Sequence, residues 1–443
     1  MNRTNDADDR ILALQRIIAS REQAPRERTV LGILYLQKGD SDAAHEQFLK
    51  AAAEDPLWTD AHEGLGSIAI KRGDFDAARP HFLRAIAINP DNLSARFALY
   101  DIEQALHNTP VALAHQMEIL ARQRLFTIRA PNEQRSVLIL LAPGDWKANV
   151  PVDFLIDFST TTVHKLYLTD DGALPPIPKA DLIFCAIGES DAAIPLLHQA
   201  EALVAQLGLP CINRPQRIVH TSRTGILESL GTCSDLALAP TRRCSREELL
   251  EDVRAHQETL LIRPVDSHAG LGLERFPADD EREENVRAYM ERVCADYYYI
   301  APFIDYKNDD GYYRKYRIIC VDGEPYPFHL AISDKWMIHY YNAPMRDHLW
   351  MREEEQRFLA DLPATMGTTA CEALRAIARR TNLEYVGVDC SILPDGRLLV
   401  FEADPAMIVH HLGADGVFGY HVPYARAIYA AFERLMDRLR ARS

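Results

Sequence analysis

Apolar positions along the first 130 residues follow helical spacing, and the spacing changes after that point. In residues 7–24, apolar side chains recur on one face, which predicts a single amphipathic helix. Those side chains are Ile11, Leu12, Leu14, Ile17 and Ile18. Around Ala130-Pro131-Asn132 the helical period gives way to short apolar runs. The pattern therefore predicts a helical N-terminal part followed by a part that contains strands.

An internal repeat lies within the helical part. Eight positions recur after 34 residues, and small residues, a Phe and a Pro are among them. The pairs are Leu31/Leu65, Gly32/Gly66, Gly39/Gly73, Asp40/Asp74, Ala44/Ala78, Phe48/Phe82, Ala51/Ala85 and Pro56/Pro90. This period and these residues resemble the tetratricopeptide repeat, in which each unit is a pair of helices. A third, degenerate copy is expected over residues 93–126, and flanking helices are expected to cover the ends of the array.

Strands alternate with helices after residue 134. Apolar runs at residues 136–141, 163–168 and 181–187 predict strands, and residues 191–207 predict a helix. This alternation indicates a small parallel α/β domain over residues 134–218.

Further elements complete the chain. A strand at 259–264 runs into the glycine-rich loop 265–273, and a second strand covers residues 297–305. Residues 312–325 predict a hairpin around Asp322-Gly323, with Tyr313, Lys315 and Arg317 on one face. Helices are expected at 351–363, 369–381 and 422–440.

The most informative stretch is a hairpin predicted at residues 385–405, where two apolar runs flank Pro394-Asp395-Gly396. Asp389 lies on its first strand, while Glu402 and Asp404 lie two residues apart on the second. Strand alternation places Glu402 and Asp404 on one face, and a suitable register would bring Asp389 beside them. Three converging carboxylates favour a hard divalent cation, above all Mg²⁺. The alternative is a half-solvated hairpin whose acids face water.

Composition narrows the class of protein. The chain has 443 residues, 47% apolar and 26% charged, which is typical of a soluble globular protein with two to four domains. No apolar run approaches the roughly 18 residues needed to cross a membrane, and no signal peptide is evident. Eight scattered cysteines favour free thiols in a cytoplasmic protein. A net charge of −15 argues against general binding to nucleic acid.

The order D-x(12)-E-x-D-P after a Gly-Val pair resembles the metal hairpin of the ATP-grasp ligase superfamily, with Asp404 in place of the usual Asn. The resemblance covers about residues 135–440. It implies a multidomain α+β and α/β fold, in which an all-α helical repeat precedes an ATP-grasp fold with a small α/β pre-domain. The expected domains are a helical repeat domain at 1–130, a pre-domain at 134–218, a small lid domain at 219–300 and a large domain with the metal hairpin at 301–443.

The resemblance also implies a ligand set for ATP and Mg²⁺. The metal ligands would be Asp389, Glu402 and Asp404. Arg317 would be catalytic, touching phosphate or an acyl intermediate. The nucleotide would be bound by Arg223, Arg263, Gly270, Gly272, Ala301, Phe303 and Lys335. Arg223 and Arg263 stand where the family usually has Lys, and a guanidinium can pair with phosphate oxygens in a forked geometry. The alternative for the glycines is an ordinary hairpin turn, and for Lys335 a surface position.

The implied activity is an ADP-forming carboxylate–amine ligase that forms a C–N bond through an acyl phosphate, with a peptide or amino-acid substrate. A small-molecule kinase and a non-catalytic nucleotide-binding scaffold are the alternatives. The repeats could bind a protein or peptide partner or form a homodimer; equally, they could be purely structural. No membrane association is expected.

Overall fold

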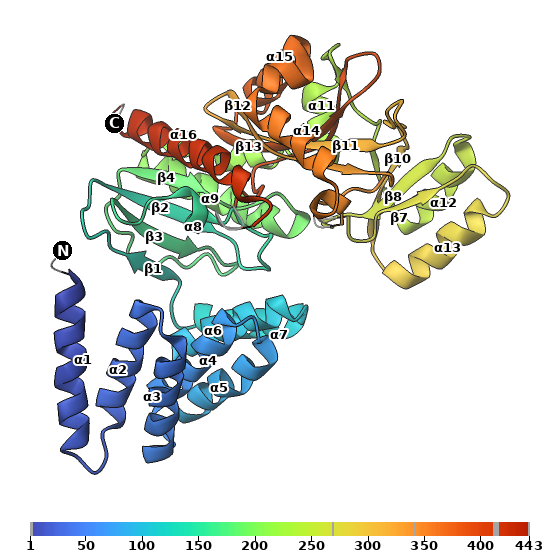
Figure 1. The fold of residues 1–443 in the computed structure, drawn as a ribbon. Coiled ribbons are helices and arrows are strands. Elements are labelled where there is room, and N and C mark those ends of the chain that lie inside the picture. Colours follow the sequence, from blue (N-terminus) through green and yellow to red (C-terminus); the bar gives the residue numbers. More distant parts are fainter. Residues whose placement is uncertain (1–2, 268–269, 341, 411–415, 442–443) are drawn as a thin grey trace. The chain divides into compact units, whose positions relative to one another are not determined.

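The computed structural model describes residues 3–267, 270–340, 342–410 and 416–441. The chain divides into two compact units, residues 1–124 and 125–443 (Figure 1). In this described part, no helix is long and apolar enough to cross a membrane.

The first unit consists of helices in sequence, most of them in consecutive pairs (Figure 1). They are α1 (Arg3–Ala19), α2 (Pro25–Lys38), α3 (Ser41–Glu54), α4 (Thr59–Lys71), α5 (Phe75–Ile88), α6 (Leu93–Ala105) and α7 (Thr109–Leu120). The pairs α2–α3, α4–α5 and α6–α7 confirm the two predicted repeats and the degenerate third copy. The first predicted helix was placed too late: α1 ends at Ala19, because Pro25 opens a new helix and residues 20–24 connect the two.

Glycine and phenylalanine together explain how the repeat packs. A Cβ on Gly32 would lie 2.7 Å from the ring of Phe48, and one on Gly66 would lie 2.5 Å from the ring of Phe82. Each ring is therefore seated directly on the backbone of the neighbouring helix. The repeated aspartates cap the second helix of each pair, since Asp40 accepts a hydrogen bond from the Ala43 N–H.

The first sheet of the second unit is parallel apart from one edge. Its strands, in spatial order, are β1 (Leu125–Ile128), β3 (Thr161–Tyr167), β2 (Arg135–Leu141), β4 (Leu182–Cys185) and β5 (Cys211–Ile212). The predicted parallel α/β arrangement is confirmed for β2 to β5, while β1 was not predicted and pairs antiparallel to β3. The associated helices are α8 (Val152–Leu155), α9 (Ile194–Leu207) and α10 (Pro215–Ile218).

The second sheet is small and antiparallel and has a core of its own. In spatial order its strands are β7 (Arg242–Ser245), β10 (Tyr297–Pro302), β8 (Leu260–Pro264) and β9 (Glu274–Phe276). Helices α12 (Arg246–Ala255) and α13 (Arg282–Val293) pack on it through Leu249, Val286 and Tyr289.

The third sheet carries the predicted hairpin. In spatial order its strands are β12 (Glu324–Ser333), β11 (Tyr313–Val321), β13 (Tyr385–Ile392), β14 (Leu398–Asp404) and β6 (Leu236–Ala237). Its helices are α11 (Arg223–Leu230), α14 (Leu349–Ala360), α15 (Leu362–Thr381) and α16 (Val422–Arg440). Gly367, with φ of 84°, kinks α15 between the two helices predicted in this region. Strand β6 comes from the segment 219–300 yet pairs with β14, so that segment contributes to two sheets.

Candidate active site

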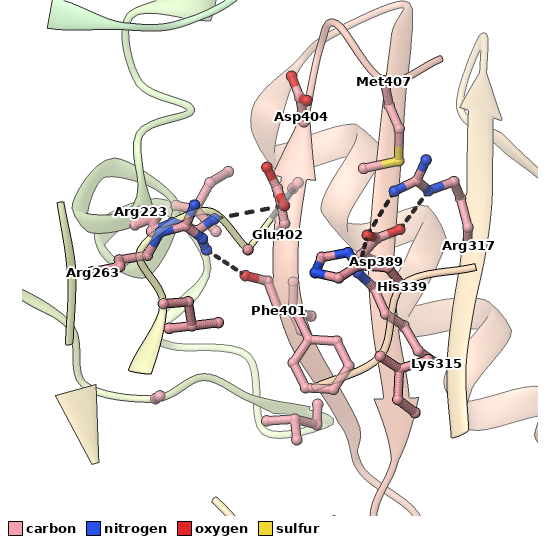
Figure 2. A pocket seen from close by; sticks show the side chains of 18 of the residues that line it. Arg223, Arg263, Lys315, Arg317, His339, Asp389, Phe401, Glu402, Asp404 and Met407 are labelled. Atoms are coloured by element: carbon pink, nitrogen blue, oxygen red, sulfur yellow. Dashed lines mark hydrogen bonds and ion pairs between the residues drawn. The ribbon is translucent and has the colours of Figure 1, made fainter. Parts of the chain in front are cut away.

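Strands β13 and β14 form the predicted hairpin, with Asp389 directly opposite Glu402. Residues 394–396 lie in the turn between the strands, and the Leu393 N–H donates to the Arg397 carbonyl oxygen at 3.0 Å. The register is thus one that brings Asp389 beside Glu402. In Figure 2 the carboxylates of Glu402 and Asp404 follow one another along β14, with two arginines on one side and Asp389 on the other.

Asp389 is buried and already paired with two cations. Arg317, opposite it on β11, donates from Nε to Oδ1 at 2.7 Å and from Nη2 to Oδ2 at 2.8 Å. The Nζ of Lys315 lies 2.6 Å from Oδ2 (Figure 2). Burial alone would raise the pKa of Asp389, but Arg317 and Lys315 outweigh it and hold that pKa well below its usual range. Asp389 is thus a carboxylate with both oxygens engaged.

Glu402 and Asp404 are less constrained. Glu402 Oε2 lies 3.6 Å from Nη2 of Arg223, and Asp404 Oδ1 accepts a hydrogen bond from the Ala406 N–H at 2.7 Å. Burial and the charge of Glu402 raise the pKa of Asp404. The pKa of Glu402 is lowered: burial opposes the shift, and Arg223 is the largest influence in its favour. A group that offsets negative charge would stabilise this pair of carboxylates.

Two arginines face the pair from other elements. Arg223 begins α11, whose first turn is capped by Ser222, and its Nη1 donates to the Phe401 carbonyl oxygen at 3.0 Å. Arg263 is 8% exposed on β8 and donates from Nε to Ser267 Oγ at 3.0 Å. Burial, and then the charge of Arg223, lower the pKa of Arg263 to about 9. Among the described residues Arg263 has no carboxylate partner, so an anionic ligand would complete its environment.

Replacing Arg263 with Met is expected to leave the ligand-free protein as stable or more stable by about 1 kcal/mol, because it removes a buried cation that Glu402 offsets only in part and without direct contact. The same change should weaken binding of ATP, measured by calorimetry, because a phosphate contact is lost. Thermal denaturation of the ligand-free variant measures the change in stability. The control is Arg287→Met, at an exposed position on α13. A clear loss of stability without a loss of binding would contradict a role in binding anions.

The glycine-rich segment closes the hairpin between β8 and β9. Gly270 and Gly272 have φ of 70° and 68°, a conformation that favours glycine. A Cβ on Gly270 would collide with the imidazole of His339, and one on Gly272 would lie 2.8 Å from Cδ of Pro264. The segment is a hairpin turn in which both glycines lie close to neighbouring side chains, and its contact with phosphate stays a prediction. His268 and Ala269, within the same loop, lie outside the described residues.

A cavity of about 710 Å³ unites these groups. Its walls come from the second and third sheets and from the loop that follows β4, and all predicted site residues line it except Gly272 and Lys335. The residues it brings together are Arg223, Arg263, Gly270, Ala301, Phe303, Arg317, Asp389, Glu402 and Asp404. Lys335 is exposed and does not line the cavity, whereas its neighbour Trp336 does and packs edge-to-face on Phe303 at 5.6 Å between ring centroids.

Sequence reasoning missed a polar cluster at the cavity wall. Glu355 on α14 is fully buried and accepts hydrogen bonds from the Leu330 N–H at 3.0 Å and the Tyr420 hydroxyl at 2.5 Å. His421, which lines the cavity, has Nε2 3.1 Å from Glu355 Oε1. Glu355 stands in the charged run 352–357, yet it shares a helix face with the buried Met351, Phe358 and Leu359. The helical spacing between Glu355 and these apolar residues was the signal in the sequence that could have predicted its burial.

The three acids differ in how well they fit a Mg²⁺ ion. In the described part of the chain, no three His, Cys, Asp or Glu side chains converge as a metal site. Glu402 and Asp404 fit the ion, since hard cations take carboxylate oxygens and often bind through one or two carboxylates plus phosphate. Asp389 would first have to release Lys315 or Arg317.

Comparisons with known proteins find similarity in both units. Residues 29–92 match a family model described as tetratricopeptide repeat. The D-alanine–D-alanine ligase from Bacillus anthracis is 12% identical, with 70% of this chain and 98% of that chain covered and a TM-score of 0.45. A RimK domain ATP-grasp protein from Sphaerobacter thermophilus is 14% identical, with 68% and 98% covered and a TM-score of 0.41.

The protein MamA is 19% identical over 26% of this chain and 63% of its own, with a TM-score of 0.25. A search of curated proteins found no significant match. The repeat match agrees with the 34-residue period found in the sequence. Because each TM-score is below 0.5, the chemistry of this chain has to be inferred from its hairpin and its cavity rather than from these structures.

Proposed function

We propose that this chain is an ATP- and Mg²⁺-dependent ligase that joins a carboxylate to an amine through an acyl phosphate. The observation that carries the proposal is one cavity in which Arg223 and the buried Arg263 face the carboxylates Glu402 and Asp404. Such a site offers positive charge to phosphate oxygens and oxygen ligands to a metal. A sheet face can be stabilised by apolar side chains alone, so a mixture of buried charges of both signs favours a role in ligand binding.

The residues that line the cavity would have distinct tasks. Arg223, Arg263 and the backbone of the loop at Gly270 would bind phosphate oxygens. The backbone of Ala301 and Phe303 would meet the base. Glu402 and Asp404 would hold Mg²⁺, which when bound neutralises charge on the phosphates during transfer. The predicted phosphate contact of Lys335 would require that exposed side chain to turn into the cavity.

The reaction has two displacements. A substrate carboxylate oxygen attacks the γ-phosphorus of ATP, and the bond to ADP breaks. The amine nitrogen then attacks the acyl carbon, and inorganic phosphate leaves with its bonding electrons while the amine loses its proton. Arg317, which lines the cavity and holds Asp389, would contact the phosphate or acyl group.

The domain division belongs to the same proposal. The first sheet would be the pre-domain, the second sheet the lid, and the third sheet the large domain with the hairpin. The repeats at residues 29–92 would then bind a protein or peptide, which makes a peptide or amino acid the favoured substrate.

Replacing Glu402 with Gln should weaken Mg²⁺-dependent ATP binding by at least about 100-fold, because even residues that only support metal ligands contribute about 10–100-fold to metal affinity. Calorimetry with ATP, with and without Mg²⁺, measures the change. Glu324→Gln, at an exposed position on the same sheet, is the matched control. If wild-type protein binds no nucleotide, the proposal fails.

Trapping with hydroxylamine distinguishes the ligase from a kinase that uses the same fold. The protein is incubated with candidate carboxylates, ATP and hydroxylamine. Hydroxylamine converts an acyl phosphate to a hydroxamate. A phosphoryl group on a hydroxyl gives no hydroxamate, so ADP release without hydroxamate would favour a kinase.

A further inference from the structure

Asp389 occupies an unusual position for a residue predicted to bind metal. It is 1% exposed, lies opposite Arg317 across β11 and β13, and receives Lys315 from two residues earlier on β11. Both cations reach it because residues two apart on a strand share a face. The two oxygens together receive three charged contacts, at 2.6–2.8 Å.

We propose that Lys315 and Arg317 stay on Asp389 when nucleotide binds. The site then holds one metal ion, on Glu402 and Asp404. The ammonium group of Lys315 supplies a fixed positive charge in place of a second metal ion. This inference rests on the proposed nucleotide binding and concerns how this chain balances charge around the phosphates.

Charge opposes the approach of a metal to Asp389. One carboxylate there faces two cations, so the group carries a net positive charge before any ligand arrives. A divalent ion within reach of Asp389 would be repelled by both side chains. At Glu402 and Asp404 the balance is different, because two carboxylates face two guanidinium groups, Arg223 and Arg263, and among the described residues the one ion pair between these groups joins Arg223 to Glu402 at 3.6 Å.

The geometry around Asp389 also opposes the approach of a metal ion. The Arg317 fork spans both oxygens of Asp389 in the bidentate arrangement that fixes such pairs. Mg²⁺ dehydrates reluctantly and keeps several water molecules, and a carboxylate that is 1% exposed leaves little room for them. Withdrawal of either cation would leave its own charge partly buried, since the Lys315 side chain is 15% exposed. Because Lys315 lines the cavity, its ammonium can also contact a phosphate oxygen.

The test counts metal ions. Wild-type protein is dialysed to equilibrium with Mn²⁺ and AMP-PNP, a non-hydrolysable analogue of ATP, and bound Mn²⁺ is measured against bound nucleotide. One Mn²⁺ per nucleotide is expected, with an electron paramagnetic resonance spectrum free of coupling between two ions. This measurement needs no variant. Two Mn²⁺ per nucleotide, or a coupled spectrum, would overturn the inference.

A charge-balanced variant tests the role of Asp389 directly. Lys315→Met combined with Asp389→Asn removes one charge of each sign, and Lys179→Met is the matched control at an exposed lysine that does not line the cavity. Mn²⁺ affinity in the presence of AMP-PNP should stay within about threefold of wild type, whereas loss of a direct ligand would cost well over about tenfold. A loss of that size would overturn the inference while leaving nucleotide binding, and the proposed function, intact. Absence of AMP-PNP binding in the wild type would instead refute the proposed function, and the inference with it.

Discussion

Replacing Phe48 with Ala is expected to lower the free energy of unfolding of the repeat unit by about 3–5 kcal/mol, the usual loss for a large buried aromatic side chain. Phe48 is 1% exposed, and its ring rests on Gly32 and Gly64 from two different helices. Neither glycine has a side chain that could move into the space left by the ring. The cavity would therefore persist, which places the loss at the high end of the range.

Hydrogen exchange followed by mass spectrometry measures this prediction segment by segment in the full chain. Peptides from residues 25–90 should lose protection, while peptides from residues 125–443 should not. The control is Leu49→Ala, the next residue on α3, whose side chain is 48% exposed. Equal effects from both substitutions would show that the Phe48–glycine contact does not hold the repeat together.

The repeat unit could be predicted because its information is local and periodic. Gly32, Phe48 and Pro56 recur at 34 residues, and each has one structural task within a pair of helices. The boundaries of α1 were less accessible, because its end is set by the start of the next helix at Pro25. Strand β6 was missed since two residues form a strand only beside a partner, here β14, more than 150 residues away in the chain.

At the site, the hairpin could be predicted and the environment of its acids could not. Alternation and the Pro-Asp-Gly turn fix which acids share a face. The partners of Asp389 depend on which strand pairs with β13, and that is a long-range choice. The same limit applies to Lys335, placed as a phosphate ligand by sequence position although its side chain turns outward.

Replacing Arg317 with Met is expected to lower the free energy of unfolding by about 3–5 kcal/mol, because one partner of a buried ion pair is removed and the other remains. Lys315 would still contact Oδ2 of Asp389, but no described cation other than Arg317 contacts Oδ1. Arg397→Met, in an exposed ion pair with Asp395 at the hairpin turn, should cause no measurable change. A similar loss in both variants would mean that burial does not decide the strength of the Arg317 pair.

The pH dependence of this loss follows from the pKa of Asp389, which the two cations hold well below its usual range. A carboxyl group with a lowered pKa in the folded state contributes its stability above the unfolded value, about 3.9, and loses it as the pH falls further. Urea denaturation at pH 7 and pH 5 should therefore give the same difference between wild type and Arg317→Met. Both proteins have the same unfolded state, so the difference between them should shrink only at low pH, where Asp389 takes up a proton in the folded variant but stays charged in the folded wild type. A difference that shrank already between pH 7 and pH 5 would mean that Asp389 takes up a proton in the folded variant at that pH, and that Lys315 alone does not keep it charged.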